Sequence, residues 1–143
     1  MAKSGRYSAD RKKIEDLSAD KTVEVHDCGT IFTLSKAAGL AVVLPDASAC
    51  GPGWWCKFIV KVAPASGDYT VDASAGDADN MHGLGLTSED DQGTPSHTNG
   101  TAIDQAKLAQ SKAKIGDQLE VVTDGSLWYV TALVQEHDAI VYA

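Results

Sequence analysis

The segment spanning residues 116–134 constrains the fold of this chain more than any other stretch. Two runs of strand-forming residues, 119–123 and 126–134, flank the dipeptide Asp124-Gly125. Asp-Gly between such runs is a strong short-range signal for a β-hairpin, because both central residues of a type I′ turn have positive φ. Both faces of this hairpin carry apolar residues. We therefore expect cover on both sides, from a second sheet or from a neighbouring subunit.

The composition places the chain among single-domain acidic proteins. It has 143 residues and a formal net charge of −8, from 20 acidic and 12 basic side chains. A chain of this length can bury a core without disulfides or metals. The acidic balance argues against binding nucleic acid through a basic face.

The sequence offers no signal for a membrane. No apolar run approaches the ~20 residues of a membrane-spanning helix. The basic N-terminus is not followed by the apolar region of a secretory signal peptide. We predict synthesis in a cytoplasm and no membrane partner.

The three cysteines, Cys28, Cys50 and Cys56, form no even disulfide framework. Cys50 and Cys56 could close a small loop, but a reducing compartment disfavours that bond. His26 and the cysteines are ligand types that zinc prefers, yet the short Cys spacing of structural zinc sites is absent. Small buried thiols and a histidine on a strand explain these residues better.

Other catalytic and metal motifs are equally weak. Asp77, Asp79 and Asn80 begin like a calcium loop, but the glycine and the final glutamate of such a loop are missing. Ser66 and Ser74 lack the G-x-S-x-G frame of a hydrolase nucleophile, and no phosphate-binding loop is present. We predict that the protein is not an enzyme and uses no cofactor and no metal.

Residues 1–20 differ from the rest of the chain. They are polar and nearly neutral, and Tyr7, Ile14 and Leu17 are their sizeable apolar side chains. A short helix over residues 11–17 would place Ile14 and Leu17 on one side. The segment is either a frayed tail or an arm that becomes ordered on a partner. We divide the chain into an N-terminal arm, residues 1–20, and a β domain, residues 21–143.

From Lys21 onward the hydrophobic period is two, as in half-buried strands. Pro45 and Pro64 end two of the runs, because proline cannot donate to a strand ladder. We count about seven or eight short strands, with turn signals about every 8–12 residues. This spacing predicts an all-β fold, an antiparallel β-sandwich or jelly-roll-like single domain.

Two segments fit this pattern less well. Residues 76–104 are rich in Gly, Asp, Ser and Thr and show no sustained period. Long irregular loops are uncommon in compact domains and are often functional. Residues 106–114 have the composition of a short helix or of a strand with Leu108 inward.

The adjacent indoles of Trp54 and Trp55 suggest an interaction surface. In an extended backbone, successive side chains point to opposite faces, so both cannot enter one core. One indole is then exposed or buried against another chain, where Trp is enriched; an irregular loop that tucks both inward is the alternative. The predicted interaction residues are Trp54, Trp55, Tyr7, Ile14 and Leu17.

Several short patterns carry a resemblance to a known family. They are D-x-G-x-x-F-x-L at 27–34, A-x-G-x-A-V-x-L-P at 37–45, K-F-I-V at 57–60, N-M-H-G at 80–83, and G-D-x-x-E-x-x-x-D-G-x-x-W-Y-V at 116–130. With them the chain resembles small structural proteins found on tailed-phage particles, especially those of marine phages. The resemblance covers residues 27–130. The chain departs from the pattern at G-P-G-W-W, inserted between Cys50 and Cys56.

The resemblance implies a function that the residues alone do not give. Relatives of this kind decorate capsids as cement proteins or form modules of tail fibres and spikes, often as trimers. It implies a virion protein that binds the major capsid protein at junctions between subunits and stabilises the shell. The alternative is a receptor- or glycan-binding module of a tail appendage that uses Trp54, Trp55 and residues 76–104. A small hydrolase acting on host polymers is a third option, disfavoured because no acid/base pair stands out.

Overall fold

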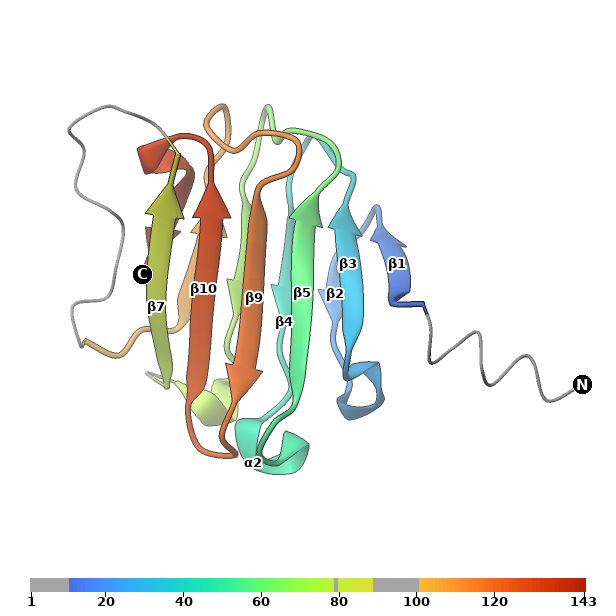
Figure 1. Ribbon diagram of the computed structural model, residues 1–143, viewed down its shortest axis with the longest axis vertical. Coiled ribbons are helices and arrows are strands. Elements are labelled where there is room, and N and C mark those ends of the chain that lie inside the picture. Colours follow the sequence, from blue (N-terminus) through green and yellow to red (C-terminus); the bar gives the residue numbers. More distant parts are fainter. Residues whose placement is uncertain (1–10, 79, 89–100) are drawn as a thin grey trace, which may run out of the picture.

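Two β-sheets face each other across one hydrophobic core in the computed structural model, which describes residues 11–78, 80–88 and 101–143 (Figure 1). Sheet A has the strand order β1 (Lys13–Leu17), β3 (Thr30–Leu34), β5 (Trp55–Val60), β9 (Gln118–Thr123), β10 (Trp128–Val134) and β7 (Met81–Thr87). Sheet B has the order β11 (Ile140–Tyr142), β8 (Gln105–Leu108), β6 (Tyr69–Asp72), β4 (Leu40–Val43) and β2 (Lys21–Thr22). The short helices are η1 (Val25–Asp27), α2 (Ala47–Cys50), η2 (Ala75–Asp77) and η3 (His137–Ala139). The prediction of an all-β fold is confirmed.

Alternation along the strands builds the core. In β10 every second residue from Trp128 is buried, and the residues between them are exposed. Phe32 of β3 stacks on Phe58 of β5, with ring centroids 5.4 Å apart. Side chains of sheet B, such as Leu108, complete the same buried cluster. The inner face of each sheet is therefore apolar, as the two-residue period of the sequence requires.

The connections differ from the predicted antiparallel arrangement. The first six strands alternate between the sheets, so β1, β3 and β5 run parallel in sheet A and β2, β4 and β6 run parallel in sheet B. Each parallel pair is joined through a strand of the opposite sheet. Antiparallel pairing appears from β8 onward, at β6–β8, β8–β11, β5–β9 and β9–β10, whereas β7 and β10 are parallel. Turn residues mark where the chain reverses, but they do not tell which sheet receives the next strand.

The N-terminal prediction needs a correction. Lys13–Leu17 forms no helix; it is β1, an edge strand parallel to β3. Leu17 lies in the core, and Ile14 faces solvent. Residues 13–17 of the predicted arm thus belong to sheet A, whereas Tyr7 and the rest of residues 1–10 lie outside the described residues. The polar sequence suits an edge strand, because charged side chains there discourage pairing with other chains.

The central hairpin is confirmed, but its turn differs from the predicted one. Thr123 pairs with Trp128, so the loop has four residues instead of two. Gly125 has the expected positive φ of 94°, but Asp124 does not. The Asp124 side chain instead accepts hydrogen bonds from the backbone N–H groups of Ser126 and Leu127, both at 2.8 Å. This Asx-type turn replaces the two-residue type I′ turn.

The two ambiguous segments contain strands. Residues 105–108 form β8 with Leu108 inward, so the strand alternative is correct there. Within the predicted loop 76–104, residues 81–87 form β7, and residues 79 and 89–100 lie outside the described part. The period of β7 is obscured by its glycines, Gly83 and Gly85.

Candidate interaction surface on the six-stranded sheet

The outer face of sheet A, the face turned away from the core, is built from rows of side chains that follow the strand register. In the order β1, β3, β5, β9, β10, β7, one row is Ile14, Ile31, Lys57, Glu120, Thr131 and Leu84. The next row is Asp16, Thr33, Ile59, Gln118, Leu133 and Leu86. The third row runs from β5 to β7 as Trp55, Val122, Tyr129 and His82. Cross-strand neighbours of this kind have Cβ atoms about 5 Å apart, so each row is continuous.

Four large apolar side chains are exposed next to one another on this face. Leu84 and Leu86 of β7 are 49% and 52% exposed, and Tyr129 and Leu133 of β10 are 43% and 49% exposed. We call these four residues the apolar strip. Small monomeric proteins rarely leave large contiguous apolar patches in water, and such patches often bind a partner.

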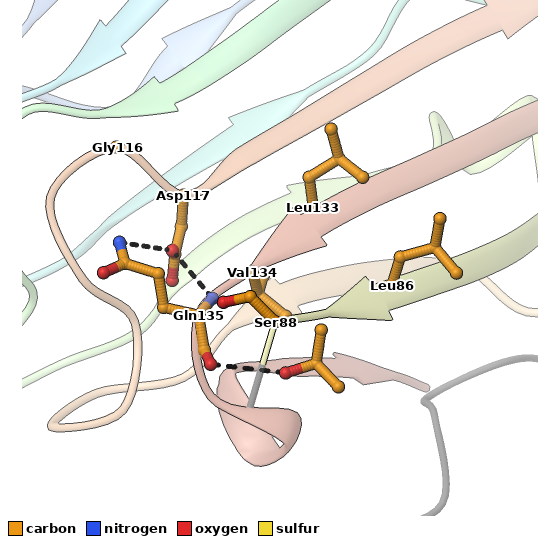
Figure 2. A pocket seen from close by; sticks show the side chains of 8 residues that line it. Leu86, Ser88, Gly116, Asp117, Leu133, Val134 and Gln135 are labelled. Carbon is orange, nitrogen blue, oxygen red and sulfur yellow. Dashed lines mark hydrogen bonds between the residues drawn. The ribbon is translucent and has the colours of Figure 1, made fainter. Parts of the chain in front are cut away.

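An open pocket of about 330 Å³ lies at one end of the apolar strip (Figure 2). Figure 2 shows Leu133 on β10 and Leu86 on β7, with Asp117, directly before β9, close to Gln135, which directly follows β10. Asp117 is buried and accepts hydrogen bonds from the backbone N–H and the side-chain amide of Gln135, at 3.1 and 3.0 Å. The pocket thus has apolar walls and a carboxylate already engaged in the fold, which suits an apolar side chain of a partner.

The two tryptophans point to opposite sides of sheet A. Trp54 is buried, packs edge-on against Trp128 at 5.6 Å and donates from Nε1 to the Val25 carbonyl oxygen at 2.7 Å. Trp55 is half-buried on the outer face, where it pairs with Val122.

The structure divides the five predicted interaction residues. Trp54 and Leu17 are core residues, and Tyr7 lies outside the described residues. Trp55 and Ile14 both lie on the outer face of sheet A. Ile14 is in the first row on the edge strand β1, and Trp55 is in the third row on the central strand β5. The sequence did not predict the apolar strip, because β7 and β10 are far apart in the chain and pair in parallel.

Three buried aspartates hold turns together, and the sequence did not single out this role. Asp27 and Asp117 each accept a hydrogen bond at 2.9 Å from the backbone N–H three residues earlier. Asp77 accepts from the backbone N–H of Ala47 and from Nε1 of Trp128. Asp77, the first residue of the calcium-like motif, therefore serves the fold, and Asp79 lies outside the described residues.

The cysteines are free thiols of unequal burial. Cys28 is exposed, Cys50 is half-buried and Cys56 is buried. Burial raises the pKa of Cys50 to about 11 and holds the pKa of Cys56 well above its usual value. Both remain protonated near neutral pH and are poor nucleophiles and metal ligands. Among the described residues, no group of three or more His, Cys, Asp or Glu side chains has the arrangement of a metal site.

Comparisons of the chain with protein-family models, with curated proteins and with solved structures find no match. Within the described part of the chain, no helix is long and apolar enough to cross a membrane. The functional proposal therefore rests on the side chains of the outer faces.

Proposed function

We propose that this protein is a non-enzymatic structural protein of a virus particle, a head decoration (cement) protein. In this proposal its two sheets form a sandwich that binds the outer capsid surface at junctions between major capsid subunits and stabilises the shell. The observation that carries the proposal is the apolar strip on the outer face of sheet A. Four exposed large apolar side chains in one patch favour a protein that works while bound to other protein subunits.

The positions that carry the resemblance belong to the scaffold of the fold. Phe32 and Leu34, from the first pattern, are fully buried core residues. Asp117 and Gly125, from the last pattern, form turns at the two ends of the central hairpin. A family defined by such positions shares a scaffold, and its members differ in what their outer faces bind.

The use of polar side chains favours a structural role over catalysis. The buried carboxylates of Asp27, Asp77 and Asp117 accept hydrogen bonds from backbone amides. Catalytic acids and bases are instead usually found in clefts, within reach of a substrate.

The proposal also includes partners and a location, which the resemblance supports. They are the major capsid protein, further copies of this chain, for which the resemblance implies a homotrimer, and the capsid surface after synthesis in the host cytoplasm. The net charge of −8 keeps such a protein soluble before it docks.

The test is to count copies of the protein in purified virus particles by quantitative mass spectrometry. A decoration protein should occur in a number comparable with that of the major capsid protein, and particles stripped of it should lose stability to heat. Rebinding of purified protein should restore that stability. Absence from particles, or a copy number confined to the tail, would contradict the decoration role.

One observation favours the alternative, a receptor- or glycan-binding module of a tail fibre or spike. Trp55 and Tyr129 lie in the same outer-face row, and the Tyr129 hydroxyl donates to the Asp124 carboxylate at 2.9 Å. Aromatic rings beside a carboxylate can bind a sugar or a peptide. In that case the copy number is low, and the isolated protein binds host cells or glycans.

A further inference from the structure

The centre of sheet A carries a matched pair of opposite charges. Three strands lie on each side of the boundary between β5 and β9. Lys57 of β5 and Glu120 of β9 are directly opposite each other across this boundary and point outward. Within the described part of the chain, neither side chain forms an ion pair or a side-chain hydrogen bond. Both charges are therefore available to a partner.

We infer that the outer face of sheet A binds a second copy of this chain, related by a two-fold axis that runs parallel to the strands between β5 and β9. The inference rests on the proposed role of this face in assembly and names its occupant. An axis in this position lays β5 over the partner's β9, β3 over the partner's β10 and β1 over the partner's β7. Lys57 then faces the partner's Glu120, and by symmetry Glu120 faces the partner's Lys57.

The same operation matches the side chains around the charge pair. Trp55 falls opposite the partner's Val122, and Ile14 falls opposite the partner's Leu84. Ile14 is 64% exposed in the single chain, so this contact removes one of its most exposed apolar side chains from water. Sheets packed face to face cross at about 30°, so the matches are closest near the axis, where Lys57 and Trp55 lie.

Gly29 adds a detail of shape. Its backbone N–H donates to the Trp55 carbonyl oxygen at 2.8 Å, which places Gly29 beside Trp55 in the third row. Having no side chain, Gly29 leaves space on the outer face, and the two-fold operation places the partner's Tyr129 over that space. At the rim, Asp16 falls opposite the partner's Leu86, so the apolar contact ends there in a polar border.

The size of the face fits a specific dimer. Six strands about 4.8 Å apart and three rows about 6.7 Å apart cover about 600 Å² in projection. Specific interfaces bury about 800 Å² of accessible surface per partner, and accessible area exceeds projected area. In the three-fold arrangement that the resemblance implies, by contrast, each face would meet a different surface of its neighbour, so Lys57 would not meet Glu120. The charge pair therefore favours two-fold self-association in place of the homotrimer.

The test uses charge reversal in the full-length protein, with mass measured by sedimentation over a range of concentrations. We expect the wild type to dimerise and Lys57→Glu and Glu120→Lys each to weaken dimerisation at least about thirtyfold, because each places like charges together twice. The double variant should restore it. Lys36→Glu makes the same charge change on an exposed turn and should leave dimerisation unchanged.

Mixing the two single variants gives the sharpest result. In a mixed dimer both contacts join a carboxylate of one chain to an ammonium of the other, so two variants that fail to self-associate should associate with each other. A monomeric wild type, a trimeric mass, or a mixture that stays monomeric would each overturn the inference. Counting copies in virus particles is independent of these outcomes, so a failed two-fold contact and a failed decoration role are distinguishable.

Discussion

The outer faces of the two sheets differ although their inner faces are alike. On sheet A the apolar strip exposes Leu84, Leu86, Tyr129 and Leu133. On sheet B the outer side chains are mostly polar and paired with one another: Lys107 lies 3.6 Å from Asp68, and Asp72 accepts hydrogen bonds from Thr70 and Gln105. Among the described residues, Val141 is the large apolar side chain exposed on that face.

This difference shows which faces of the two sheets the fold requires to be apolar. Both sheets bury every second residue in one shared core, so both inner faces follow from stability. Polar outer side chains on sheet B show that this fold does not require an apolar outer face. The apolar strip is therefore not needed for folding, and our proposal assigns it to assembly with other subunits.

The largest expected effect tests whether the inner faces are equivalent. Leu119 of sheet A and Leu108 of sheet B are both fully buried. We expect Leu119→Ala and Leu108→Ala each to lower the free energy of unfolding by about 2–5 kcal/mol, with one cooperative transition. Chemical denaturation followed by tryptophan fluorescence measures both. Separate unfolding transitions for the two sheets would show that their inner faces do not form one cooperative core.

The next effect tests the outer faces with one substitution on each. Leu133→Asp puts a charge into the apolar strip, and Val141→Asp makes the same change on sheet B. We expect Leu133→Asp to weaken self-association about a hundredfold, whereas Val141→Asp has little effect, because only the first places an unpaired carboxylate in the inferred interface. Sedimentation measures association, and Tm shows that both variants fold. Equal effects of the two substitutions would mean that the apolar strip is not an interface.

Whether a feature of the fold or of the outer face could be predicted from the sequence depends on how far apart in the chain its residues lie. Local signals were sufficient for the hairpin around Gly125 and for the burial of Val121, Trp128, Val130 and Ala132. The prediction that Trp54 and Trp55 point to opposite faces also needed only the alternation of a strand. Each of these features depends on residues close together in the chain.

The remaining features depend on residues far apart in the chain. The apolar strip forms because β7 pairs with β10 in parallel, which places Leu86 beside Leu133. No turn residue specifies such a pairing. Asp77 contacts Ala47 and Trp128 for the same reason, so a sequence pattern alone cannot separate this structural carboxylate from a calcium ligand. The polar edge strand β1 has too little apolar alternation to be predicted.

A smaller effect separates the scaffold of sheet A from its outer face. Gly125 has φ of 94°, and a Cβ atom built there would lie 3.3 Å from Pro52. We expect Gly125→Val to lower the free energy of unfolding by about 2 kcal/mol, because a β-branched residue is strained at positive φ. Association of the molecules that remain folded should not change. Ser126→Val in the same turn is the control, and denaturation curves that coincide for the two variants would refute the turn assignment.

The smallest effect is a pH dependence that links the turn to the apolar strip. Backbone N–H groups of Leu127 and Ser126, and then the Tyr129 hydroxyl, hold the pKa of Asp124 below its ordinary value of 3.8. The folded state therefore favours the carboxylate, so its contribution to stability is complete well above about pH 4 and is lost as the pH falls below that value.

We expect the Tm of the wild type to exceed that of Asp124→Asn at neutral pH, with the gap closing as the pH falls below about 4. Tyr129→Phe should retain most of this pH dependence, because the two backbone donors remain, but it frees the ring at the end of the apolar strip. Its effect should therefore be seen in self-association more than in Tm. A gap that stays constant with pH would show that the Asp124 charge does not stabilise the turn, and the link between the turn and the outer face would then be one of shape alone.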